Sequence, residues 1–258
     1  EHRACIQMIE RVTLDKVILI ADRGYENYNI MSHAIEKGWK FLIRIKDVHS
    51  NGIASGLELP QTAVFDMDIN LILTRNQTKS KKPTVQTFDY LPIGSKEDYP
   101  ISFRIARFKI ADDSYETVIT NLDRFCFSAE KLKELYHLRW GIETSFRELK
   151  YAIGLTSFHA KKVDYIKQEI FARLTLYNYC ELITTYVVEH TENISKKNQV
   201  NFTIAIYICR EYLRRKRKLR PPDVVKLIEK HILPIRPGRR DPRKVKPQAS
   251  VSFLYRVA

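Results

Sequence analysis

The sequence predicts a mixed α/β fold with an inserted β-rich segment and a helical C-terminal part. Three observations carry this expectation. The pattern of the first 46 residues is helix, strand, helix, strand. The following stretch alternates apolar and polar residues, and most of the second half has apolar residues at helical spacing.

Residues 1–46 have the pattern of a βαβ unit preceded by a helix. Apolar spacing predicts the first helix over residues 2–12, and Asn27 is expected to cap the second. Two apolar runs, Lys16–Ala21 and Trp39–Lys46, are typical of strands buried on both faces. Because the connections are short, we expect these strands to be parallel neighbours.

Residues 47–122 are expected to form an inserted antiparallel β-subdomain. Alternation in segments such as Ala63–Thr74 and Ile101–Ile110 predicts about five strands, of which Tyr115–Thr120 is the last. Ser128 then caps a long helix, so residues 123–160 are assigned to a core helix.

Residues 161–258 are expected to hold helices and a basic tail. Helical apolar spacing predicts three helices, over Asp164–His190, Asn201–Arg217 and Pro221–His231. The stretch Pro234–Pro247 is rich in proline and arginine, which predicts an extended tail.

The composition is that of a folded globular protein. The chain has 258 residues, of which 44% are hydrophobic and 29% charged, so it is long enough to bury a core. No run of 18 uncharged apolar residues occurs, so no membrane span is expected. The four cysteines lack metal-site spacing and are interpreted as buried thiols in a reducing cytoplasm: Cys5, Cys126, Cys180 and Cys209.

The positive charge is concentrated at the C-terminal end. The net charge is +14, and from Arg210 onward 16 Lys or Arg stand against 4 Asp or Glu. Such a distribution favours a polyanionic partner, of which nucleic acid is the commonest in the cytoplasm. The alternative is a tail that only increases solubility. An anionic membrane surface is disfavoured, because the Arg214–Arg220 cluster lacks an apolar face.

Four polar residues fall on one face of the helix that begins at Ser128. Tyr136, Arg139, Glu143 and Lys150 stand at i, i+3, i+7 and i+14, within a stripe roughly 60° wide on an ideal α-helix. The carboxylate offers hard oxygen to Mg²⁺, the two cations suit a phosphate, and the phenol adds a hydroxyl. The alternative is a solvated helix face with ion pairs.

Asp22 stands directly after a predicted buried strand, in the run Asp22-Arg23-Gly24-Tyr25. The carboxyl ends of the strands are where α/β sheets place their sites. A carboxylate there could share metal ions with Glu143 if the later helix packs beside the strand. The alternative is a turn residue or helix cap.

These features together resemble the catalytic region of a DDE transposase. More narrowly, they are similar to the transposases of bacterial insertion sequences with a Tyr-Arg-Glu-Lys signature, in the RNase H-like (retroviral integrase) superfamily. The motifs are Asp22–Tyr25 after a strand, a β-insertion, and Tyr-x2-Arg-x3-Glu-x6-Lys on a helix. The resemblance covers almost the whole chain.

The resemblance implies an RNase H-like core and a catalytic role for two carboxylates. Asp22 resembles the second acidic residue of the family and Glu143 the third. They would hold two divalent ions, Mg²⁺ or Mn²⁺, about 3.5–4 Å apart. The attacking oxygen would come from water when the end of the element is nicked, and from a DNA 3′-hydroxyl in strand transfer.

The resemblance also implies double-stranded DNA, both transposon ends and target, as the partner of a homodimer at the bacterial nucleoid. Tyr136, Arg139 and Lys150 would bind terminal phosphates of the element, and Arg23 and Tyr25 would assist in DNA contact. Trp140 could stack on an unpaired base, although a buried tryptophan is the commoner arrangement.

The chain departs from the family in lacking a first catalytic Asp. Asp15 lies seven residues before Asp22 along an extended run, roughly 23 Å away, and Asp47 is better interpreted as a turn residue. The first strands of the fold are also missing, so we expect an incomplete core in an N-terminally truncated chain. We then expect Lys16–Ala21 to have an unpaired edge, and the chain alone to bind metal poorly and cut little DNA.

Two other functions stay open. One is a catalytically dead remnant that binds DNA or dimerises. The other is a different RNase H-like nuclease, such as a resolvase, against which the long β-insertion and the signature spacing count.

Overall fold

The computed structural model describes residues 1–48, 50–75, 85, 87–191, 198–215, 220–235 and 252–253. The chain divides into two compact units, Glu1–Trp140 and Gly141–Ala258. This division falls inside the region 123–160, which was expected to be one core helix. Each unit is described by itself.

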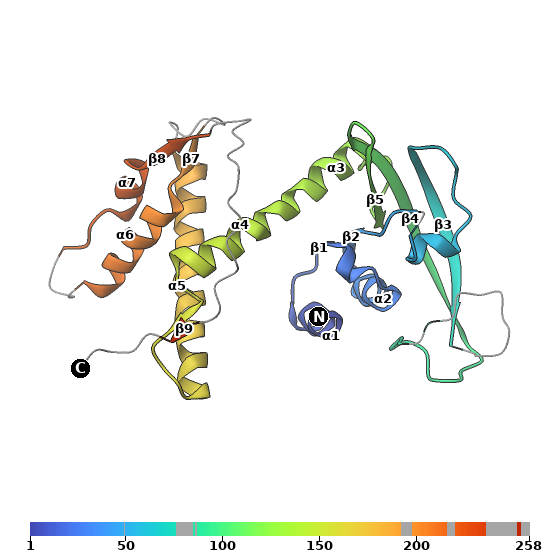
Figure 1. Cartoon of the computed structure of the whole chain (residues 1–258), viewed down its shortest axis with the longest axis horizontal. Helices are drawn as coiled ribbons and strands as arrows, with labels where there is room; N and C mark the ends of the chain where they lie inside the picture. The colour runs from blue at the N-terminus through green and yellow to red at the C-terminus, as the bar shows by residue number, and fades with distance from the viewer. Residues whose placement is uncertain are drawn as a thin grey trace. The chain divides into compact units, whose positions relative to one another are not determined.

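The first unit is built on a five-stranded sheet of strand order β1-β2-β5-β4-β3 (Figure 1). Its strands are β1 (Ile18–Ala21), β2 (Lys40–Arg44), β3 (Phe65–Thr74), β4 (Asp98–Ala111) and β5 (Ser114–Thr120). The pair β1–β2 is parallel, which confirms the expectation, and the other pairs are antiparallel.

The β-rich region 47–122 differs from the prediction. Its described residues form three strands, not about five, and these strands continue the sheet that β1 and β2 begin. Leu42 of β2 pairs with Thr120 of β5, so the backbone of β2 is hydrogen-bonded on both sides. The alternating pattern indicated strands correctly, but it carries no information about which strand pairs with which.

Strand β1 lies at one edge of this sheet. Among the described strands it pairs with β2 alone, as expected of an unpaired edge. Residues Ile18–Ile20 are therefore half-buried, and the expectation of a strand buried on both faces was wrong.

Helices cover both faces of the sheet. On one face Phe41 and Ile43 pack with residues of α1 (His2–Arg11) and α2 (Tyr28–Glu36), which lie side by side. On the other face Leu42 packs against α3 (Ala129–His137). Successive side chains of a strand point to opposite faces, so one five-residue strand contributes to both cores.

The side-chain caps predicted at the starts of two helices are confirmed. The Asn27 side chain accepts a hydrogen bond from the backbone of Asn29 at the start of α2, and Gly38 has the positive φ (73°) that follows the end of this helix. The Ser128 side chain likewise accepts from the backbone N–H of Lys131 at the start of α3.

The second unit is mainly helical (Figure 1). Its helical elements are α4 (Gly141–Arg147), a π-helical turn (Glu148–Ala152), α5 (Val163–His190), α6 (Phe202–Arg214) and α7 (Val224–Glu229). Short strands pair β6 (Ser157–Phe158) with β9 (Ser252–Phe253) and β7 (Asn198–Val200) with β8 (Ile232–Pro234). Among the described residues no helix has the length and apolarity that crossing a membrane requires.

One expectation for a buried residue was wrong. Cys126 is exposed, whereas Cys180 and Cys209 are buried. The tail predicted over Pro234–Pro247 lies mostly outside the described residues.

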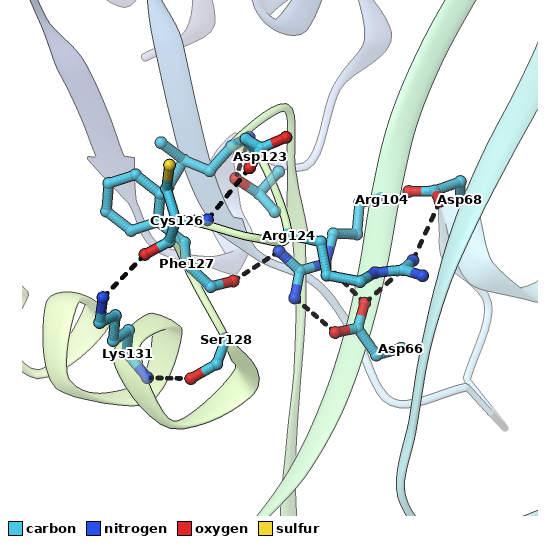
Figure 2. A network of polar contacts seen from close by, with 11 residues as sticks. Asp66, Asp68, Arg104, Asp123, Arg124, Cys126, Phe127, Ser128 and Lys131 are labelled. Carbon is cyan, nitrogen blue, oxygen red and sulfur yellow. Dashed lines mark hydrogen bonds and ion pairs between the residues drawn. The ribbon is translucent and has the colours of Figure 1, made fainter.

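A polar network fixes the chain segment that leads into α3 (Figure 2). The side chain of Arg104, 2% exposed on β4, donates to both carboxylate oxygens of Asp66 on β3 and to the backbone carbonyl of Phe127 at 2.7 Å. The carboxylate of Asp123 accepts from the N–H of Cys126 (3.0 Å). The residues just before α3 are thus held to two strands of the sheet.

A surface ion pair extends this network. Arg124 donates to Asp68 at 3.0 Å and lies 3.5 Å from Asp66 (Figure 2). Arg124 is 45% and Asp68 69% exposed, so solvent screens this pair. The buried pair of Arg104 and Asp66 is the one whose loss would leave a charge without compensation.

We therefore predict that Asp66→Asn lowers the free energy of unfolding by about 3 kcal/mol, because it leaves the buried Arg104 guanidinium without its carboxylate. Asp68→Asn is the matched control and should change it by less than about 1 kcal/mol. Both tryptophans lie in the first unit, so denaturant titration followed by their fluorescence measures the relevant transition. Equal effects of the two variants would contradict the prediction.

Candidate active site

Asp22 lies where β1 ends, as the sequence predicted. One carboxylate oxygen, Oδ1, accepts the N–H of Arg23 at 2.7 Å and so caps the single 3₁₀ turn Arg23–Tyr25. The residue is half-buried, and its backbone is still extended. Asp22 is therefore a cap, and its second carboxylate oxygen takes no part in that bond.

Two charged residues on the neighbouring strands lie beside Asp22. Ala21 is paired with Ile43, so the residues that follow them, Asp22 and Arg44, leave the parallel strands next to each other. Arg44 is paired with Val118 of β5, and Glu116 lies two residues away on the same face. Glu116 forms an ion pair with Arg44, at 3.2 Å from Nε.

Helix α3 and the turn after it bring two signature residues close to the strand ends at Asp22 and Arg44. Leu132 and Tyr136 pack against the sheet, and Tyr136 is only 2% exposed. Its buried hydroxyl makes no hydrogen bond with any described residue. The guanidinium of Arg139 lies over the rings of Tyr136 (5.6 Å) and Trp140 (5.0 Å).

The charges of this edge act on one another. Burial raises the pKa of Glu116, the cations Arg44 and Arg139 lower it, and Asp22 raises it further. Burial likewise raises the pKa of the Tyr136 phenol, against the opposing effect of Arg139. These mutual effects place both carboxylates, both guanidinium groups and the phenol in one electrostatic neighbourhood.

A pocket of about 790 Å³ opens beside α3 at this edge. Aromatic surface comes from Tyr136 and Trp140. The charged residues of the lining are Arg44, Lys133, Glu116, Glu130 and Glu134. Apolar walls with a few convergent polar groups are typical of ligand sites. Tyr136 is thus part of the lining, and its hydroxyl is buried behind that surface.

The helix that carries the signature is not one regular α-helix. After α3 comes a 3₁₀ turn, Leu138–Trp140, then α4, then the π-helical turn Glu148–Ala152. An α-helix turns by about 100° per residue, whereas 3₁₀ and π turns rotate the chain by different angles. The four signature residues therefore do not form the single narrow stripe that was calculated for an ideal α-helix. Tyr136 is buried against the sheet, whereas Glu143 is exposed.

The predicted residues are distributed over both units. Asp22, Arg23, Tyr25, Tyr136, Arg139 and Trp140 belong to the first unit, and Glu143 and Lys150 to the second. Glu143 lies in the first turn of α4, and Lys150 is half-buried in the π-helical turn.

The residues around Asp22 and the signature differ in exposure. Arg23 is exposed and Tyr25 half-buried, with its ring 6.2 Å from the ring of His2. Trp140 is 51% exposed, so the expectation of a buried tryptophan was wrong. Tyr136 is the last residue of α3 that packs on the sheet, and Trp140 lies beyond it in the 3₁₀ turn.

The donor chemistry suits a hard divalent cation, because Asp22 and Glu143 offer carboxylate oxygens. Among the described residues, no group of three or more His, Cys, Asp or Glu side chains is placed to hold a metal ion. Asp47 accepts from Arg107 at 3.3 Å. It thus has a partner on β4, in keeping with a turn residue.

Sequence reasoning missed Arg44 and Glu116. Both lie in predicted strands, and Arg44 is the one charged side chain within the apolar stretch Phe41–Ile45. That pattern was a usable signal for Arg44, because its strand was already expected to end beside Asp22. No comparable signal existed for Glu116, since the pairing of β5 with β2 was not foreseen.

Comparison with known proteins identifies the family of this chain. A family model described as "Transposase DDE domain" matches residues 1–179. A probable transposase for insertion sequence element IS5377 of Geobacillus stearothermophilus is 25% identical over 169 residues, 65% of this chain and 40% of the relative.

A second relative matches a shorter stretch. It is a transposase for insertion sequence element IS421 of Escherichia coli, 39% identical over 57 residues, 22% of this chain and 15% of the relative. The chain therefore spans less than half the length of these relatives.

The raised pKa of Glu116 predicts a pH dependence of stability. A carboxyl whose pKa is higher in the folded than in the unfolded state binds its proton more tightly in the folded state. The free energy of unfolding therefore falls as the pH rises above 4.5, the ordinary pKa of a glutamate side chain. Glu116→Gln should remove this decline. Melting temperatures of both proteins between pH 4 and pH 7 would test it, and identical pH profiles would contradict it.

Proposed function

Because this chain belongs to the DDE-domain transposases of bacterial insertion sequences, we propose that it carries the site for cleaving transposon ends and transferring the strands to target DNA. The observation that carries the proposal is the meeting of Asp22, Tyr136 and Arg139 at one edge of the sheet. A carboxylate, a phenol and a guanidinium there can bind and orient a phosphodiester.

Tyr136 supplies the most specific support. A buried hydroxyl without a hydrogen-bond partner costs roughly 1–3 kcal/mol, and that of Tyr136 has none among the described residues. A non-bridging phosphate oxygen in the pocket would satisfy it, while Arg139 beside the same ring neutralises the phosphate charge. Tyr136, Arg139 and Lys150 are therefore assigned to the terminal phosphates of the transposon end.

Asp22 and Glu143 are the residues that would hold Mg²⁺ or Mn²⁺, with two ions in a complete site. The bound cation supplies a Lewis acid for the attacking and leaving oxygens. Asp22 is prepared for this role, because the bond from Arg23 fixes one oxygen and leaves the other outside that bond. We assign the β1–β2 region with α1 and α2 to an RNase H-like core.

Other contacts with double-stranded DNA follow from exposure and charge. Trp140, half-exposed at the pocket, offers a ring on which an unpaired base can stack, and Arg23 and Tyr25 lie directly after Asp22. The excess of cations from Arg210 onward suits the backbone of transposon ends and target. We also propose a homodimer that bridges two ends, acting at the bacterial nucleoid.

A second candidate is a transposase-derived protein that binds DNA or dimerises without chemistry. It draws on the cationic segment from Arg210 onward, where 16 Lys or Arg stand against 4 Asp or Glu and which suits a DNA backbone whether or not the chain cuts. The two candidates share the DNA surface and differ in whether this chain cuts.

The test is nicking and binding of transposon-end DNA in Mg²⁺ or Mn²⁺. Nicking that disappears in Glu143→Ala would support the first candidate, and binding without nicking would favour the second.

Arg139→Met should reduce the slope of log affinity against log salt by about 0.9, the value for one phosphate contact. Lys96→Met, an exposed cation in the loop before β4, is the control. Equal slopes for both variants would refute the assigned phosphate contact.

A further inference from the structure

Glu116 is a largely buried acid where the proposed function places a phosphate. Its side chain is 12% exposed on β5, and it lines the same pocket as Tyr136 and Trp140. A carboxylate repels a phosphate, and Asp22 already supplies one negative charge nearby. Glu130 and Glu134 also line the pocket but are exposed to solvent, so the less exposed Glu116 is the carboxylate that needs a physical reason.

The ion pair with Arg44 gives that reason. Glu116 lies 3.2 Å from Nε of Arg44, which is 33% exposed. A guanidinium has five N–H donors in a rigid plane, so a partner at Nε fixes the plane and leaves the two terminal nitrogens for another acceptor. Arg44 lines the pocket, so that acceptor can be a molecule bound there.

Two simpler roles explain Glu116 less well. As a stabilising ion pair it would contribute little, since desolvation offsets the attraction of partly buried charges. As a metal ligand it would have to leave Arg44, whose Nε lies 3.2 Å from its carboxylate. Orientation of Arg44 accounts for both its burial and its place in the pocket.

We propose that Glu116 is a positioning residue: its ion pair with Arg44 orients that guanidinium so that Arg44 and Arg139 bind the same terminal DNA phosphate beside the Tyr136 hydroxyl. This inference rests on the proposed function and extends it to two residues outside the signature. Arg44 comes from the strand end next to Asp22, and Arg139 from the turn after α3. The phosphate would thus be gripped from the sheet and from the helix.

The experiment compares affinity for a short blunt DNA duplex carrying 5′-phosphates with affinity for the same duplex carrying 5′-hydroxyls. The ratio isolates the contribution of the terminal phosphate from general attraction to DNA. Glu116→Gln and Arg44→Met should each lower this ratio about ten-fold, the size of one charge-assisted hydrogen bond. The double variant should lower it no further, because both changes remove one interaction.

Controls separate positioning from folding. Glu134→Gln removes the same charge from the lining of the same pocket and should leave the ratio unchanged. Melting temperatures establish that the variants fold. Should Glu116→Gln not fold, Glu116→Asp keeps the charge on a shorter side chain and should give an intermediate ratio.

The outcomes distinguish the inference from the function on which it rests. DNA binding that depends on Arg139, with a ratio unaffected by Glu116→Gln and Arg44→Met, overturns the inference alone. Loss of Mn²⁺ binding in Glu116→Gln, with an unchanged ratio, makes Glu116 a metal ligand and also overturns it. Failure of the unsubstituted chain to bind DNA overturns both.

Discussion

The docking of α3 on the sheet is the constraint on which the first unit depends. Leu132 and Tyr136 are buried against strands β2, β4 and β5, and Arg104 holds the residues before the helix through Asp66 and the Phe127 carbonyl. The buried guanidinium cannot lose its carboxylate without a large cost. The helix start is therefore fixed, and with it the position of every residue up to the 3₁₀ turn.

Tyr136 shows how packing and function share one side chain. Its ring completes the core between α3 and the sheet and also lines the pocket, while its buried hydroxyl has no hydrogen-bond partner among the described residues. A phenylalanine would fill the core equally well, so packing alone gives no reason for the hydroxyl, and we propose that a phosphate oxygen does. A buried polar group that lacks a hydrogen bond, and so costs stability, is the kind of exception that is expected at functional sites.

Much of this arrangement could be predicted from the sequence. The parallel β1–β2 pair, the caps Asn27 and Ser128, and the place of Asp22 at a strand end all follow from local patterns. The helical stripe did not, because the turns at Leu138–Trp140 and Glu148–Ala152 depend on packing rather than on apolar spacing. Glu116 was unpredictable for a related reason: its neighbours are set by strand register, which short-range patterns leave undetermined.

The central claim is that the strand ends at Asp22 and Arg44, with Tyr136 from α3 and Arg139 from the turn after it, hold the end of the DNA. The most direct test is photo-crosslinking of a duplex with a photoreactive group on its terminal phosphate, followed by mass-spectrometric mapping. Crosslinks to peptides that contain Asp22–Tyr25, Arg44 or Tyr136–Trp140 are predicted. Crosslinks confined to the basic segment after Arg210 would contradict the claim, since they would mean that the tail alone holds the end.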